Sequence, residues 1–469
     1  MKKTLLERSA TAFAQGGTLI FLLCCFLLGG SSRADQPAQI GIRTIAIAMI
    51  AIALFFIKKN ELNRVRTPLL FLGALLSLML LQIVPLPPQI WHNLPGREIA
   101  VQGSALTGLM DIWRPLSFEP HATLNSLLAT LPGFGVILLL AMMRSYDLYK
   151  VVILLVLLML LSGALGLIQA SSGQLYFYGA ANRGGAVGFF ANRNHQAAML
   201  TCLIPMLALL VPYFSDRIPI GLRVAIASVL SLFIIPLVLV TGSRTGILLL
   251  VVGCAGGLLL VRKSGINMRA AFGPPSSWLR RLMRAAPLAL SIGLAALVVT
   301  LMVSGRAIAI NRLFDQDVEA DDRLQLFTTM IDMARAHFPF GTGFGTFPTM
   351  FKIVEPDWYV RAPYFNHAHN DLLEIIIEGG ILSLALMLAF IAWWSIISLR
   401  LWRSDSSSDR KIALGRLGSI ITLIFTLASV VDYPLRTPIG QVLFLFAMVL
   451  MARATEKSPD MRLLESDRE

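Results

Sequence analysis

The sequence is poor in charged residues. Only 14% of its 469 residues are charged and 56% are hydrophobic, with a mean hydropathy of +0.72, whereas soluble domains contain about 25% charged residues. Such a chain needs lipid around it, which excludes an ordinary soluble enzyme or binding module. Apolar windows of about 20 residues, the length that crosses a bilayer, recur along almost the whole chain. The composition therefore predicts a single polytopic membrane domain over residues 1–469.

Cysteine is also scarce, and all four cysteines fall inside apolar windows: Cys24, Cys25, Cys202 and Cys254. This excludes a disulfide framework and the cysteine spacings of metal sites. The net charge of +13 does not indicate nucleic-acid binding, because the meaning of basic residues in a membrane chain depends on the side on which they lie. We expect membrane lipids as partners and no nucleic acid.

The apolar windows predict an all-α integral membrane protein with about twelve transmembrane helices. They cover residues 11–30, 40–57, 69–86, 124–143, 151–170, 195–213, 222–240, 245–261, 285–303, 372–399, 412–431 and 441–451. An even number puts both termini on one side, and Lys2, Lys3 and Arg8 place that side in the cytoplasm by the positive-inside rule. Most other Lys and Arg then fall in cytoplasmic loops. The outer basic residues are nearly all arginine, and the six histidines lie on the outer side or at its boundary.

The first apolar stretch has an alternative interpretation. Lys2-Lys3, the apolar run and Ser32-Arg33-Ala34 together resemble a secretory signal with a small-residue cleavage site. Cleavage would leave about eleven spans and would not change which side the later loops face.

Two outer segments are too long to be turns: a smaller periplasmic loop at residues 87–123 and a large one at residues 304–371. In the large loop, residues 323–338 have apolar side chains at spacings of three and four, which predicts an amphipathic helix on the membrane or on the bundle. These side chains are Leu324, Phe327, Met330, Ile331 and Ala334. Pro339 ends the pattern. The run Gly341-Thr-Gly-Phe-Gly345 lacks the full nucleotide-binding fingerprint and a preceding strand, so we predict a turn.

A first polar cluster, Asn192-Arg193-Asn194-His195, stands at the outer end of the sixth span. Ionisable groups where a helix enters lipid are costly unless they meet water or a charged ligand, and a helix N-terminus favours an anion. Arg193 is therefore placed to bind a phosphate. Alternatively, Asn192 and Asn194 cap the helix and Arg193 reaches lipid headgroups.

Two further arginines are candidate anion ligands. Arg244 lies in the short outer turn between the seventh and eighth spans, where a tight turn needs Gly and Ser but no arginine; the alternative is an interfacial anchor. Arg323 follows an acidic run at residues 315–322, which is no EF-hand, because Ala320 and Leu326 stand where Gly and Glu are required. The acids also suit helix capping, and Arg323 is a candidate only if it faces the membrane.

A histidine pair leads into the tenth span. His369 can take a proton from an attacking hydroxyl, and Asn370 or Asp371 could orient it. His367 and His369 could instead bind a metal ion, but no third ligand is evident, and a satisfied interfacial histidine is the commoner fate of a lone His. Arginines and a histidine from four segments thus share one face beside lipid. Because guanidinium forks suit diphosphate oxygens, this set predicts a lipid-linked phosphate as substrate.

In the order and sidedness of its motifs, the chain resembles the O-antigen ligase and Wzy-polymerase superfamily. The resemblance rests on residues 84–91 (VPLPPQIW), 113–120 (WRPLSFEP) and 188–195 (GFFANRNH), on Ser243-Arg244, on Arg323 followed by Pro339 and the glycine run, and on His369-Asn370 followed by Gly380. The family motif normally has another glycine three positions later, where this chain has Ser383. That difference puts close packing there in doubt.

The resemblance implies a metal-independent, inverting glycosyltransferase of the bacterial inner (cytoplasmic) membrane, with cytoplasmic termini and an active site facing the periplasm. It would move a glycan from undecaprenyl diphosphate to a hydroxyl of lipid A-core or of a growing glycan. Arg193, Arg244 and Arg323 would bind the diphosphate, and His369 would act as general base or orient the acceptor, without a nucleotide, metal or other cofactor. The supporting residues would be Asn192, Asn194, His195, His367, Asn370 and Asp371.

Two other classes of protein compete with this interpretation. A transporter of polysaccharide or lipid-linked glycan would more often show broken helices and charges near the bilayer midplane. A non-catalytic assembly scaffold would tolerate loss of the Arg/His set. Within the superfamily, the sequence does not discriminate ligase from polymerase.

Overall fold

The computed structural model describes residues 2–179, 181–214, 217–266, 318–360, 365–405 and 409–456. Within these ranges, ten helices are long and apolar enough to cross a membrane, and the shorter α21 (Pro438–Ala454) is also apolar. These helices coincide with eleven of the twelve expected spans. The prediction of an all-α integral membrane protein is confirmed, and the span expected at 285–303 lies outside the described residues.

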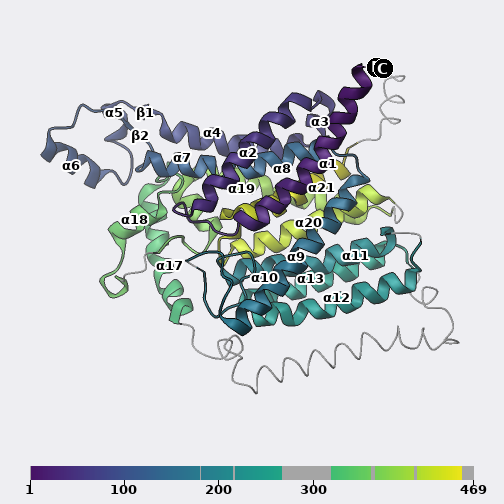
Figure 1. The fold of residues 1–469 in the computed structure, drawn as a ribbon. Helices are drawn as coiled ribbons and strands as arrows, with labels where there is room; N and C mark the ends of the chain where they lie inside the picture. Colours follow the sequence, from purple (N-terminus) through teal and green to yellow (C-terminus); the bar gives the residue numbers. More distant parts are fainter. Residues whose placement is uncertain are drawn as a thin grey trace.

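Apart from α21, the helices and strands divide into long helices and short connecting elements (Figure 1). The long helices are α1 (Lys2–Leu28), α2 (Pro37–Phe56), α4 (Arg66–Ile83), α8 (Leu131–Met142), α9 (Asp147–Ser172), α11 (Leu203–Tyr213), α12 (Ile220–Val240), α13 (Arg244–Lys263), α17 (Val318–His337), α19 (Asp371–Arg403) and α20 (Arg410–Ser429). The short pieces are α3 (Lys59–Arg64), β1 (Pro85–Leu86), α5 (Pro88–Trp91), α6 (Glu98–Thr107), β2 (Arg114–Pro115), α7 (Pro120–Leu128), α10 (Arg193–Thr201), α18 (Phe347–Val354), η1 (Asp357–Tyr359) and η2 (Pro434–Arg436).

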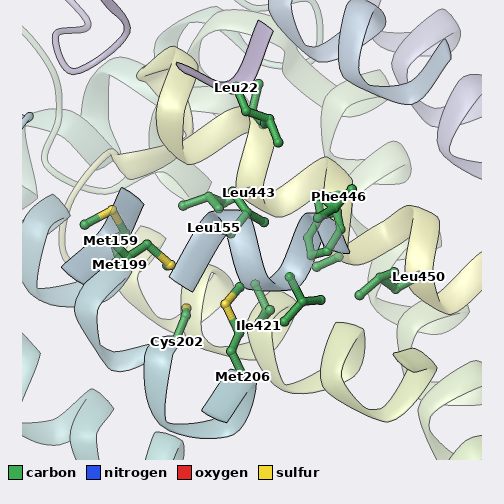
Figure 2. Close-up of a cluster of buried hydrophobic side chains, with 14 of the residues drawn as sticks. Leu22, Leu155, Met159, Met199, Cys202, Met206, Ile421, Leu443, Phe446 and Leu450 are labelled. Atoms are coloured by element: carbon green, nitrogen blue, oxygen red, sulfur yellow. The ribbon is translucent and has the colours of Figure 1, made fainter. Parts of the chain in front are cut away.

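The centre of the bundle is the segment formed by α10 and α11. Its most apolar window is 89% buried, against 22% for α2 at the periphery. Figure 2 shows part of this core, with Leu22, Leu155, Met159, Met199, Cys202, Met206, Ile421, Leu443, Phe446 and Leu450. Since lipid is as apolar as these side chains, close packing rather than escape from water holds such helices together. Glycines of α13 allow this packing, with Gly253 against Thr201 and Gly257 against Ile204.

The two ends of the bundle differ. At one end, Lys58 pairs with Glu7 of α1, and Arg64 lies 3.8 Å from Glu456, just after α21. Within the described residues, the chain therefore enters and leaves the bundle at the same end. At the other end, the Gly29–Gly30 backbone accepts hydrogen bonds from the amides of Ala191 and Ile439, which joins the starts of α10 and α21 to the end of α1.

Beyond that second end, a small arm projects from the bundle (Figure 1). Its strands β1 and β2 are antiparallel, with Pro85 opposite Pro115 and Leu86 opposite Arg114, and α5 and α6 lie between them in the chain. This arm occupies most of the smaller loop expected at residues 87–123.

The amphipathic helix expected at residues 323–338 is present as α17, but its most buried row is offset from the expected one and shares only Met330 with it. Leu326, Met330 and Met333 are at most 2% exposed, whereas Phe327 is 41% exposed. This row packs on α19 and joins a second core that contains Phe347 and Phe351. The helix therefore lies on the bundle, and the buried row begins at Leu326 because that side meets α19 and α18.

Helix α19 is interrupted at Gly380, whose backbone has φ +60° and ψ −146°. The Ile381 amide donates to Pro339 O, and the carbonyls of Ile377 and Glu378 accept from the amides of Thr342 and Gly343. The glycine run is thus a turn, as predicted, and it satisfies the backbone groups that the break leaves open. A side chain at Gly341 would meet the Glu378 carbonyl, so this turn requires glycine there.

Candidate functional site

Asp432, in the loop between α20 and η2, is the hub of a polar cluster at the end of the bundle. It is 1% exposed. Its Oδ2 accepts hydrogen bonds from the side-chain amides of Asn192 (3.1 Å) and Asn194 (2.7 Å), and His369 Nδ1 lies 3.2 Å from Oδ1. His195 Nε2 is 3.6 Å from Oδ1, too far for a hydrogen bond but near enough for an ion pair.

The surroundings of Asp432 fix its charge. Burial by itself would raise the pKa of Asp432, but His195 and His369 together hold that pKa well below its usual range. Because an ionised carboxylate only accepts hydrogen bonds, His369 Nδ1 carries the hydrogen in this pair. The ring nitrogen on the opposite side, Nε2, is then the one that can take a proton.

His369 is also held by its backbone and by a neighbouring ring. Its φ is +50°, an uncommon conformation for a residue with a side chain, which persists only where the surroundings impose it. The Tyr433 ring lies 4.9 Å from the His369 ring, centroid to centroid. The expectation that Asn370 or Asp371 orients His369 is wrong: Asn370 caps α19 through the Leu373 amide, and the acidic partner is Asp432.

Arg193 and Arg244 begin two helices that pack against each other. Arg193 is the first residue of α10, between the two asparagines that bind Asp432, and Arg244 is the first residue of α13. The Gly246 backbone lies against Ala197, so both arginines stand at the same end of neighbouring helices. Asn192 does cap α10 through the Asn194 amide at 2.8 Å. Capping and the contact with Asp432 use different atoms of Asn192 and are compatible.

The third candidate arginine, Arg323, belongs to the first half of α17, which packs on α19. Its side chain lies outside the described residues, so its relation to Arg193 and Arg244 stays a prediction. Residues 315–317 of the acidic run and the start of the large loop at residue 304 also lie outside them.

A second histidine–carboxylate pair also contacts the Tyr433 ring. His367 Nδ1 is 2.8 Å from Glu374 Oε1, and His367 Nε2 is 3.2 Å from Ser32 Oγ. Glu374 Oε2 accepts the Ala368 amide at 2.8 Å. The rings of His367 and Tyr433 are 4.4 Å apart. Sequence reasoning counted His367 as a supporting residue but missed both of its polar partners.

Arg436 joins this second pair to two more buried acids. Its guanidinium lies 3.2 Å from Asp371, 3.4 Å from Glu374 and 3.1 Å from Glu378. Burial alone would lower the pKa of Arg436, but the three carboxylates raise it, so the guanidinium stays charged. Glu378 also accepts the Gly345 amide at 2.8 Å, which ties the cluster to the glycine turn. Acidic residues inside a predicted span were the signal that could have found this cluster.

A cavity of about 360 Å³ opens beside the second pair. Its polar lining includes Ser32, His367, Glu374 and Arg436, and its apolar lining includes Leu72, Phe390 and Leu445. Within the described part of the chain, no group of three or more His, Cys, Asp or Glu residues is arranged to hold a metal ion. The site therefore offers bases, carboxylates and guanidinium groups for chemistry.

Comparison with protein-family models finds a match to O-antigen ligase over residues 227–388. This stretch, about a third of the chain, contains Arg244, Arg323, the glycine turn and His369, while Arg193 and Asp432 lie outside it. Comparison with curated proteins finds no match. The matched stretch ends within α19, eight residues beyond Gly380, so it includes the segment that carries the most specific motif. The chain is therefore a multi-pass membrane protein that carries an O-antigen ligase domain at residues 227–388.

Proposed function

We propose that the protein transfers a glycan from undecaprenyl diphosphate to an acceptor hydroxyl at the periplasmic face of the bacterial inner membrane. The observation that carries this proposal is the His369–Asp432 pair beside Arg193, at the bundle end to which Arg244 also belongs. A histidine base next to guanidinium groups suits a reaction in which a hydroxyl loses a proton while a diphosphate leaves. Family-level glycan transfer by ligases and polymerases of this type agrees with that chemistry.

In the proposed reaction, the acceptor hydroxyl gives its proton to His369 Nε2 as its oxygen attacks the anomeric carbon of the donor sugar. The new carbon–oxygen bond forms on the face opposite the diphosphate, the old one breaks, and the configuration inverts. Asp432 keeps His369 in the tautomer that accepts at Nε2 and stabilises the imidazolium that forms.

The arginines act on the leaving group. Negative charge grows on the diphosphate as the glycosidic bond breaks, and preplaced guanidinium groups lower the energy of that state more than that of the bound donor. Arg193 and Arg244 supply these groups at the starts of α10 and α13, where the helix N-termini add partial positive charge. Arg323 is the third group of this set. The scheme needs no metal ion or nucleotide.

Sidedness supports the proposal. The end with Lys58, Arg64 and the chain's entry and exit points is the cytoplasmic end by the positive-inside rule. The Asp432 cluster lies at the opposite end, where undecaprenyl-diphosphate-linked glycans would meet a lipid A-core acceptor or a growing glycan.

The test is to incubate the purified full-length protein, in lipid nanodiscs, with an undecaprenyl-diphosphate oligosaccharide and separately offered acceptors, with chelator present and no nucleotide. Lengthened lipid-linked chains would show a polymerase, and glycan on lipid A-core would show a ligase. Absence of transfer to either acceptor would contradict the proposal.

Transport is the second candidate, because α19 is interrupted and carries buried acids, features found in transporters. The same donor in proteoliposomes separates the two functions: a transporter would move the lipid-linked glycan between leaflets without forming a new glycosidic bond.

A further inference from the structure

Three side chains from distant parts of the sequence form a continuous hydrogen-bonded row in the polar lining of the cavity. Ser32 follows α1, His367 precedes α19, and Glu374 lies in the first turn of α19. Ser32 Oγ is 3.2 Å from His367 Nε2, and His367 Nδ1 is 2.8 Å from Glu374 Oε1. A hydroxyl, an imidazole and a carboxylate in this order, with the imidazole bridging through both nitrogens, is the arrangement that activates a serine nucleophile.

The hydrogen-bond directions in this row follow from its ends. Glu374 also accepts the Ala368 amide and lies 3.4 Å from Arg436, contacts that favour the carboxylate over the acid. The carboxylate accepts a hydrogen from His367 Nδ1, which leaves Nε2 as an acceptor for the Ser32 hydroxyl. In this tautomer His367 is set to take the serine proton, and burial of Glu374 keeps the imidazole in place.

The cavity suggests which bond the row would act on. Its apolar lining suits a hydrocarbon chain, and its volume of about 360 Å³ falls in the range of about 300–1,000 Å³ typical of small-molecule sites. Arg43, which also lines it, donates through Nη1 to Asn125, while its buried Nε has no hydrogen-bond partner among the described residues. Such a donor lacks an acceptor that a carbonyl oxygen would supply.

We propose that Ser32, His367 and Glu374 form a second active centre, which cleaves acyl esters whose hydrocarbon chain occupies this cavity. Ser32 Oγ bonds to the ester carbonyl carbon while its proton passes to His367 Nε2. The carbon–oxygen bond to the alcohol then breaks, and the leaving alcohol takes that proton. Water attacks the acyl-Ser32 ester with His367 again as base, releases the carboxylic acid and restores the serine hydroxyl.

This centre is separate from the one assigned to glycan transfer. His369 pairs with Asp432 and His367 pairs with Glu374, and each histidine ring contacts the Tyr433 ring. The three acidic side chains around Arg436 already occupy its guanidinium, so it is not available to a diphosphate, whereas an uncharged ester needs no cation of this kind.

The experiment is to label the full-length protein in lipid nanodiscs with an alkyl fluorophosphonate, which bonds to activated serines with loss of fluoride, and to identify the labelled peptide by mass spectrometry. We expect one labelled site, Ser32. Ser32→Ala should abolish labelling, and His367→Ala should slow it by about 100-fold or more, the usual contribution of a positioned base. The matched control is Ser31→Ala, at the neighbouring serine whose Oγ accepts the Arg33 amide; it should label at the wild-type rate.

A second readout uses p-nitrophenyl esters of increasing acyl length. From acetate towards octanoate, kcat/KM should rise by roughly fourfold for each methylene that enters the cavity.

The proposal is overturned if wild-type Ser32 stays unlabelled under conditions that fully label a known serine hydrolase in the same nanodiscs. It is equally overturned if His367→Ala labels at the wild-type rate. Loss of glycan transfer in His367→Ala, with no Ser32 labelling in the wild type, would instead make His367 part of the glycan reaction. The peptide map settles the wild-type site even if a variant fails to fold.

Discussion

Two histidine–carboxylate pairs both contact the Tyr433 ring, and they differ in what surrounds them. His369–Asp432 receives two asparagine amides and stands beside Arg193. In the His367–Glu374 pair, the carboxylate contacts Arg436, which also contacts two further acids. This pair lines a cavity that has many apolar side chains in its wall. The pairs are alike in geometry, so the neighbours decide what each can bind.

Charge explains why the two surroundings select different substrates. On the His367 side, the guanidinium of Arg436 is already held by three acidic side chains and is not available to a diphosphate. On the other side, Arg193 and Arg244 add positive charge at helix N-termini that already favour anions. The comparison therefore assigns the anionic donor to the His369 side, and the variants below test that assignment.

Removing each histidine should give the largest difference between the two sides. His369→Ala is expected to lower glycan transfer by about 100-fold to 10,000-fold, the contribution of a general base. His367→Ala should lower it less, since the carboxylate partner of His367 is Glu374 and not Asp432. The measurement is transfer by purified variants in nanodiscs, with thermal unfolding to show that both fold. Equal losses in the two variants would remove the distinction between the pairs.

Asp432→Asn should lower glycan transfer nearly as much as His369→Ala, because Asp432 acts through His369. The amide keeps the shape of the side chain but can no longer fix the His369 tautomer or stabilise its charged form, so we expect kcat to fall by roughly 100-fold or more, with KM little changed. The measurement is steady-state kinetics with the lipid-linked donor. Fluorophosphonate labelling of Ser32 should persist in this variant, and its loss would show that the two pairs act as one unit.

The fold followed from the sequence because its main signal is local. Windows such as residues 151–170 need only length and apolarity to be recognised as spans, and eleven expected spans coincide with helices. Burial on α17 was harder to predict. Phe327 and Leu326 are adjacent and both apolar, and only the position of α19 decides which of them is covered.

The site was only partly predictable. Arg193, Arg244 and His369 stand in short polar motifs at span ends, where a charge beside lipid is itself a signal. Asp432 gives no comparable signal, because a single acid after a span is common. Its role depends on the packing of α10 and α20, which brings Asn192, Asn194 and His369 to one carboxylate. No single stretch of sequence is enough to predict non-local contacts of this kind.

Replacing Arg244 by lysine keeps the positive charge and tests whether the guanidinium shape is needed to bind the diphosphate. Lysine cannot reproduce a two-pronged contact with diphosphate, and loss of one charge-assisted hydrogen bond of about 1.5–3 kcal/mol lowers transfer by roughly 10-fold to 150-fold. The matched control is Arg335→Lys, at an exposed arginine that pairs with Asp332, where we expect wild-type activity. Full activity of Arg244→Lys in the same transfer assay would reduce Arg244 to an interfacial anchor.

The smallest expected effect is on stability, at the break in α19. Gly380→Ala places a side chain at φ +60° and ψ −146°, against Pro339 O and Phe340, and should destabilise the protein by about 1–3 kcal/mol or more. The control is Gly73→Ala within α4, where a Cβ would meet nothing within 4 Å and which should stabilise by about 0.4–1 kcal/mol. Thermal unfolding in nanodiscs measures both.

Gly380 supports the first turns of α19, which carry Glu374 but not Asp432, so Ser32 labelling should fall more than glycan transfer in Gly380→Ala. The opposite order would mean that the break serves the His369 side.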